Sequence, residues 1–223
     1  IYLASFLGWR WAFVIPGLIG VAWVLIWVLI PRATVFQQQQ PGPLKPMAVP
    51  LLTLLRRRDA WIFILIRFLL DPVVYFVMFW VPKYLHEARH VSFERIGELF
   101  WIPFLALGVS NIAGGWFSDK LVAKNFSVNK ARRTVMGCAA IITMTAPLIA
   151  TVSSAEIAVA FMALFMLAHG FWITNYITSI SDVFGDKATA TVVGLSGTAG
   201  ALSSLIINPL IGLVVLQYSY SPL

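Results

Sequence analysis

Apolar residues along this chain gather into six runs separated by polar stretches. The runs cover about 11–30, 61–81, 97–117, 134–152, 157–180 and 190–216. A helix needs about 20 predominantly apolar residues to cross the hydrocarbon core of a bilayer, and these runs are of that length. The pattern therefore predicts an all-α integral membrane protein with about six transmembrane helices.

The longest polar break, 31–60, has the composition of a linker. It carries the glutamine run 37–40, a Pro-Gly-Pro sequence at 41–43 and three arginines at 56–58. This composition predicts an extended linker with one short amphipathic piece near its end. We expect three parts: a helix in 1–30, the linker, and a helical bundle in 61–223. Because the chain opens without Met and stops just past an apolar run, we also expect a fragment of a longer protein.

Composition excludes a water-soluble globular protein, since 60% of the residues are hydrophobic and only 11% are charged. The net charge of +7 does not indicate a nucleic-acid partner, because the basic residues gather in the breaks between apolar runs. The alternating breaks 31–60, 118–133 and 181–189 hold eleven Lys and Arg, whereas the breaks on the opposite side hold four. The positive-inside rule then places the linker and the 118–133 loop in the cytoplasm of a multi-pass protein of the plasma (inner) membrane.

The second apolar run carries two charges at membrane depth. Arg67 and Asp71 lie within it, and Pro72 follows immediately. At i and i+4 the two charges share one helical face, so they can pair with each other and turn away from lipid. Pro72 removes a backbone donor, which predicts a bend. With Tyr75 and other aromatic residues on the same helix, the pattern predicts a helix that lines a pathway. The alternative is a buried structural ion pair, with the aromatic residues packed against lipid.

The fifth run combines polar and aromatic side chains on one helical face. His169, Trp172 and Tyr176 follow i, i+3, i+7 spacing, and Asn175 lies roughly 100° round from Tyr176. Such a face suits a polyhydroxylated ligand, which needs both donors and acceptors. Interhelical hydrogen bonding would use the same residue types. Together with Tyr75, these are the predicted solute contacts, and His169 could also titrate near neutral pH and couple protons.

A short motif follows the third run. Two glycines precede Ser118 and Asp119, and the arginines Arg132 and Arg133 begin the next helix. An acid facing arginines across a short turn can latch two helices in one conformational state. The alternative is an ordinary basic cytoplasmic loop. The next turn holds Asp182 and Asp186 beside Lys187, which is typical of a solvated loop.

This motif resembles the cytoplasmic loop motif of the major facilitator superfamily, in its second-half copy. The stretches 67–85, 101–121 and 168–202 are similar to the anion:cation symporters that carry hexuronates, galactonate and related sugar acids. The resemblance implies helices six to eleven of a twelve-helix bundle, an organic-anion substrate and a proton as coupling ion. It also implies that the carboxylate-binding arginine and the proton-coupling acids lie mainly in the first half. Members commonly have a polar residue where this chain has Gly170.

Three function classes were compared. An enzyme would need a nucleophile with its base, a metal set or a cofactor loop; none is evident, so we expect no catalytic residue, metal or cofactor. A non-transporting scaffold or receptor would not need Arg67, Asp71 and the polar face of the fifth run. A secondary transporter of sugar acids explains all of them, and a carrier of another solute in the same superfamily is the second choice.

Overall fold

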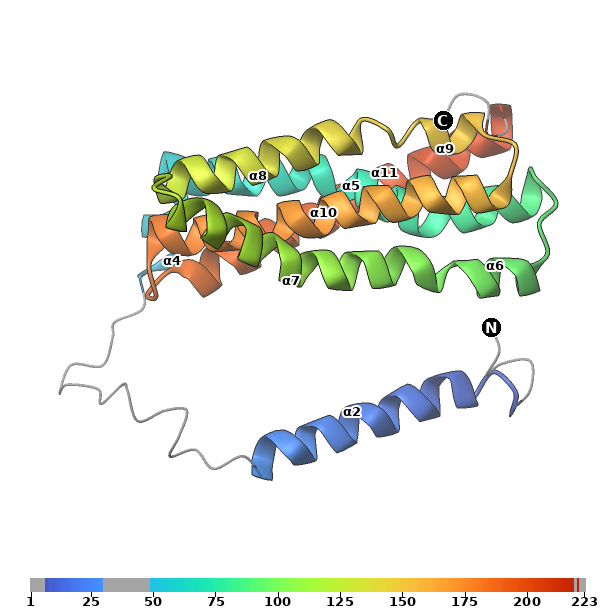
Figure 1. Cartoon of the computed structure of the whole chain (residues 1–223), viewed down its shortest axis with the longest axis horizontal. Helices are drawn as coiled ribbons and strands as arrows, with labels where there is room; N and C mark the ends of the chain where they lie inside the picture. Colours follow the sequence, from blue (N-terminus) through green and yellow to red (C-terminus); the bar gives the residue numbers. More distant parts are fainter. Residues whose placement is uncertain (1–6, 30–48, 219, 221–223) are drawn as a thin grey trace. The chain divides into compact units, whose positions relative to one another are not determined.

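The computed structural model describes residues 7–29, 49–218 and 220, and within these ranges the regular structure is helical. It contains the six predicted membrane-spanning segments, which confirms the fold class: Trp11–Leu29, Arg58–Glu87, Phe93–Ala123, Val128–Thr151, Ala155–Phe184 and Thr189–Tyr218. The described helices fall into two units. The first holds α2 (Trp11–Leu29), and the second holds α4 to α11 (Figure 1).

The second unit begins with a short helix and continues through seven more. In chain order they are α4 (Leu51–Leu55), α5 (Arg58–Glu87), α6 (Phe93–Leu99), α7 (Trp101–Ala123), α8 (Val128–Thr143), α9 (Leu148–Thr151), α10 (Ala155–Phe184) and α11 (Thr189–Tyr218). The helix α4 is the short piece expected near the end of the linker, and the glutamine run lies outside the described residues. Serines cap three helices, because Ser92, Ser127 and Ser154 each accept a hydrogen bond from a backbone N–H of the first turn.

The helices extend beyond the apolar runs, so the predicted loops are too long. The loop expected at 82–96 begins only after Glu87, and most of the loop expected at 118–133 belongs to α7 and α8. A polar side chain does not by itself end a helix, whereas a residue with left-handed backbone conformation does. Asn125, with φ of 65°, lies just past the end of α7. The fourth span is split into α8 and α9 by a turn ahead of Leu148.

Within the second unit, α10 lies in the middle, with α7 on one side and α8 on the other (Figure 1). The contact of α10 with α7 is close because both helices carry small residues there. A methyl group at Gly170 would overlap the side chain of Ser110, and one at Gly114 would lie 3.0 Å from the Cα of Phe171. The other extensive contact joins α11 to α5.

Two apolar clusters fill the bundle, one toward each end. On α10 the first cluster ends at Met166, and fully buried residues of the second begin at Tyr176. On α5 the first cluster begins at Val74, and the second contains Ala60. Arg67 and Asp71 therefore lie at the level between the two clusters. The charged groups of α5 and the polar face of α10 share this middle layer of the bundle.

Candidate functional site

The middle layer contains an ion pair on α5. Arg67 donates through Nε, at 2.8 Å, and through Nη2, at 2.7 Å, to the same oxygen of Asp71, Oδ2. The side chain of Asp71 is 6% exposed and that of Arg67 is 19% exposed. One helical turn separates the two residues, so the helix itself holds them within bonding distance. Because burying one charge without its partner is costly, the pair keeps both charges in the interior.

The helix α11 closes one side of this ion pair. Gly200 faces Asp71, and a methyl group at this glycine would overlap the carboxylate. The neighbouring buried residues of α11 are also small: Ser196, Ser203 and Ser204. The glycine therefore makes the room in which the Asp71 carboxylate lies against the backbone of α11.

The helix α10 presents a stack of rings to the same layer. Trp172 stacks on Tyr176 with ring centroids 4.8 Å apart, and His169 stacks on Trp172 at 6.0 Å. The guanidinium carbon of Arg67 lies 5.9 Å from the Tyr176 ring centroid, at the outer limit of a cation–π contact. The Tyr176 hydroxyl donates to the carbonyl oxygen of Phe63 at 2.8 Å, which fixes this ring against α5. We call His169, Trp172 and Tyr176 the ring stack.

Two of the predicted solute contacts lie elsewhere. Asn175 is fully buried, and its Nδ2 donates to the carbonyl oxygen of Gly114 on α7 at 3.1 Å and to that of Phe171, one turn earlier on α10, at 2.9 Å. Its Oδ1 has no hydrogen-bond partner among the described residues. Tyr75 stacks on Phe79 and lines a shallow, open groove between α5 and α11. The structure thus brings Arg67 and Asp71 to the ring stack and places Asn175 in a packing contact.

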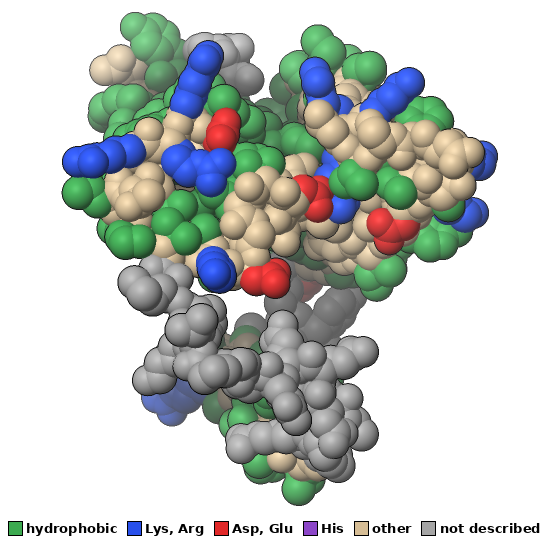
Figure 2. Space-filling view, turned by 90° about the vertical axis from the view of Figure 1, so that its left-hand side faces the viewer, with side chains coloured by type: hydrophobic (Ala, Val, Ile, Leu, Met, Phe, Trp, Pro, Cys, Tyr) green, Lys and Arg blue, Asp and Glu red, His purple; other side chains and the backbone are tan. Residues whose placement is uncertain are grey.

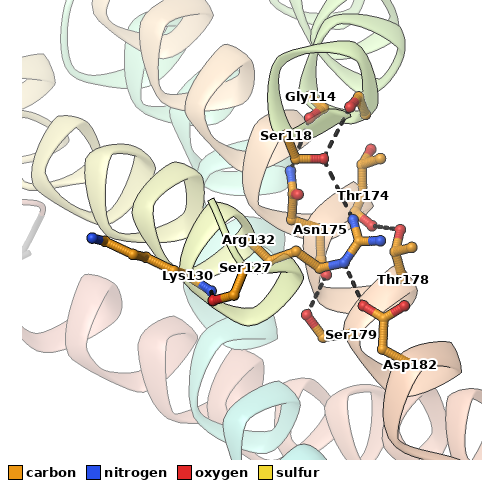
Figure 3. A network of polar contacts seen from close by, with 11 residues as sticks. Gly114, Ser118, Ser127, Lys130, Arg132, Thr174, Asn175, Thr178, Ser179 and Asp182 are labelled. Atoms are coloured by element: carbon orange, nitrogen blue, oxygen red, sulfur yellow. Dashed lines mark hydrogen bonds and ion pairs between the residues drawn. The ribbon is translucent and has the colours of Figure 1, made fainter. Parts of the chain in front are cut away.

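Arg132, which was expected to pair with Asp119 as a latch, forms its ion pair with a different acid. Arg132 of α8 forms an ion pair with Asp182 near the end of α10, and its Nη1 donates to Ser118 of α7 at 3.4 Å (Figure 3). Asp119 is exposed, and neither it nor Arg133 forms an ion pair within the described part of the chain. Arg132 therefore joins three helices, with Asp182 in the place that the sequence motif suggested for Asp119.

Comparison with known proteins identifies the family. Residues 1–207 match the Major Facilitator Superfamily. The chain belongs to this superfamily. The resemblance in the cytoplasmic loop motif is thereby confirmed at the level of the family.

Named relatives in the superfamily are anion carriers. The chain is 25% identical over 248 residues to a D-galactonate transporter of Escherichia coli, covering 100% of this chain and 56% of that protein. It is 26% identical over 234 residues to a hexuronate transporter of Escherichia coli, covering 96% and 54%. It is also 23% identical to the chloroplastic sodium-dependent phosphate transport protein 1 of Arabidopsis thaliana, covering 92% and 43%. The chain spans about half the length of these relatives.

Several contacts of this superfamily member could not be found from sequence spacing. Asp182 and Arg132 are fifty residues apart, and a solvated turn was the expected setting for Asp182. The indole of Trp80 donates to the side-chain oxygen of Asn208 at 3.0 Å, across α5 and α11. At Gly170, on α10, the close approach of Ser110 of α7 leaves no room for a side chain.

Proposed function

We propose that this chain is part of a secondary transporter that moves small organic anions by alternating access, with sugar acids such as hexuronates or galactonate as the solute. Membership of the superfamily and the names of the relatives support the class of solute. We further propose the plasma (inner) membrane as its location and the proton as coupling ion. The observation that carries the proposal is a cation, Arg67, held between two apolar clusters beside a stack of rings.

Arg67 is the proposed binding group for the solute carboxylate within this chain, in addition to the first-half arginine that the family resemblance implies. Its Nε and Nη2 both bond to one oxygen of Asp71, and Nη1 has no hydrogen-bond partner among the described residues. Guanidinium groups bind carboxylates in a two-pronged geometry, and such charge-assisted hydrogen bonds are stronger than neutral ones. A solute carboxylate can therefore approach the free edge of Arg67 or replace Asp71 on it.

Asp71 gives this site a route to proton coupling. While the carboxylate is ionised it neutralises Arg67 and competes with the solute, and when it is protonated the full charge of Arg67 is available. Few other titratable or polar groups face this ion pair and could disturb the exchange of Asp71 for the solute on Arg67. The ring stack contributes His169 and the phenol of Tyr176, and the face of α11 around Gly200 contributes serines only. Proton binding and anion binding would then favour each other, as coupled transport requires.

The ring stack is the proposed surface for the rest of the solute. Flat rings pack against the C–H face of a sugar, and the indole N–H and imidazole supply hydrogen bonds. Trp172 and His169 are partly exposed, whereas Tyr176 is buried and bonded to Phe63. Tyr75, in the open groove between α5 and α11, is a proposed second contact. We assign Asn175 to the packing of α10 on α7.

Binding measurements on the full-length protein test this site. The Trp172→Ala and Arg67→Gln variants should bind D-galacturonate or D-galactonate about 5- to 150-fold more weakly, because each loses a contact worth about 1–3 kcal/mol. Trp101→Ala is a matched control, since Trp101 is 59% exposed and lies on α7. Isothermal titration in detergent, with thermal unfolding as a check on folding, gives the affinities. If both site variants bind the solute with unchanged affinity, the middle layer is not the solute-binding site.

A different anion is the alternative solute. The relative named as a phosphate transport protein is similar to 92% of this chain, so a phosphate-sized anion is a specific competitor for Arg67. Inorganic phosphate that displaces the sugar acid at similar concentration, together with binding that does not depend on Trp172, would favour this second function.

A further inference from the structure

The two ends of the second unit differ in charge. At the end formed by α4, the start of α5 and the α7–α8 and α10–α11 turns, Lys and Arg outnumber Asp, and Figure 2 shows them spread over this face. The basic residues are Arg56, Arg57, Arg58, Lys120, Lys124, Lys130, Arg132, Arg133 and Lys187, and the acids are Asp59, Asp119, Asp182 and Asp186. We call this the basic end. Its field attracts anions from solution and from a membrane surface.

The helix α4 is fixed to the basic end by one of its faces. Leu54 is 1% exposed and belongs to the apolar cluster that contains Tyr176 and Phe184. The indole of Trp61, in the first turn of α5, donates to the carbonyl oxygen of Leu55 at 2.7 Å. No other described residue covers the opposite face of α4, where Leu51 is 50% and Leu52 63% exposed. Two exposed leucines thus stand beside three consecutive arginines.

These three arginines are not equivalent. Arg57 forms an ion pair with Asp59 at 3.1 Å and places its guanidinium 4.6 Å from the ring centroid of Phe184. The side chains of Arg56 and Arg58 are exposed and form no hydrogen bond or ion pair with any other residue that the structure describes. Arg57 therefore holds the turn in place, and the charges on either side of it are left for a partner.

We propose that α4 and the turn after it form a binding surface for anionic phospholipid. Arg56 and Arg58 bind the headgroup phosphate, and Leu51 and Leu52 enter the boundary between headgroups and acyl chains. The two exposed arginines and the two exposed leucines both fit an anionic phospholipid. A soluble anion would use the arginines and leave the leucines in water, whereas a lipid satisfies both. Trp61, 54% exposed one turn into the spanning helix, is the residue type that sits at this depth.

The test is a titration of the full-length protein in neutral detergent with phosphatidylglycerol, followed by native mass spectrometry. An arginine near an anionic surface contributes about fivefold in affinity, so Arg56→Gln with Arg58→Gln should weaken phosphatidylglycerol binding roughly 25-fold. The control removes the same charge from the same end: Lys124→Gln with Lys187→Gln, two exposed residues whose side chains form no hydrogen bond or ion pair in the described part of the chain. This control should change affinity by less than fivefold.

Two further variants separate the contributions of charge and apolar contact. Arg56→Lys with Arg58→Lys keeps both charges and should restore most of the binding. Leu51→Ser with Leu52→Ser keeps the arginines and should also weaken binding, because the acyl boundary loses its contact. Millimolar inorganic phosphate should leave the bound lipid in place. Equal losses in the arginine pair and the lysine control, displacement by inorganic phosphate, or no preference for phosphatidylglycerol over phosphatidylcholine would each overturn the proposal.

Discussion

At the scale of single residues, Gly200 decides how closely α11 approaches the Asp71 carboxylate. The carboxylate lies where the Cβ of any other residue at position 200 would be. Since protein interiors tolerate little overlap, a side chain there must move either the carboxylate or the helix. Moving the carboxylate would also disturb Arg67, because both of its bonds to Asp71 use the same oxygen. One glycine thus supports the geometry of the proposed anion site.

Replacing this glycine tests the point. Gly200→Ala should lower the free energy of unfolding in detergent by about 1–3 kcal/mol, the usual cost of overpacking an interior. Gly197→Ala is the matched control, three residues earlier on α11, because nothing lies within 4 Å of a methyl group there. Thermal or denaturant unfolding measures both. A loss of stability that is equal in the two variants would mean that helix flexibility matters at α11 and the contact with Asp71 does not.

At the scale of elements, different faces of α10 make contacts with different helices. The ring stack looks toward α5, while Gly170 and Asn175 pack on α7. Asn175 and Tyr176 are consecutive, yet about 100° of helical rotation is enough to place one against α7 and the other against α5. At the end of the helix, Asp182 binds Arg132 of α8. A shift of α10 would therefore change its contacts both in the middle layer and at the basic end.

A double-mutant cycle identifies the acid that acts on Arg132. Arg132 and Asp182 should show a coupling of roughly 0.5–1 kcal/mol in unfolding free energy, because their ion pair is partly exposed. The same cycle with Asp119 should give a coupling near zero, since Asp119 forms no ion pair in the described structure. Denaturant unfolding at low salt provides both values. Should the Asp119 cycle give the larger coupling, the original interpretation of the motif would be restored.

The sequence predicted what depends on local spacing and missed what depends on packing. The six spans were predictable because apolar length follows from bilayer thickness, and the approach of Arg67 to Asp71 followed from the helical repeat. Helix ends were less predictable, because polar residues such as Asp119 continue a helix into water. The contact of Asn175 depends on the close approach of α7, and the spacing of residues along α10 does not predict which helix packs against it. Solute contacts at these residues remain predictions.

At the scale of the whole molecule, each end of the second unit has its own polar contacts. At the end opposite the basic one, Arg95 of α6 binds Glu156 of α10 at 2.7 Å, and Arg89 donates to the carbonyl oxygen of Ala150 at 3.0 Å. Acids here outnumber basic residues by four to three: Glu87, Glu94, Glu98 and Glu156 against Lys83, Arg89 and Arg95. The asymmetry predicts the direction in which the unit crosses the membrane, with the basic end in the cytoplasm.

Cysteine labelling in intact cells tests that direction. The loop residues His90 and Asn125 have left-handed backbone, with φ of 54° and 65°, so a cysteine is better placed at their exposed neighbours Ala88 and Lys124. The background lacks other reactive cysteines and therefore carries Cys138→Ser, because Cys138 is exposed on α8. A membrane-impermeant maleimide should label Ala88→Cys from outside, and Lys124→Cys only after the cells are permeabilised. If both cysteines react from the same side, the positive-inside assignment fails, and with it the placing of the basic end in the cytoplasm.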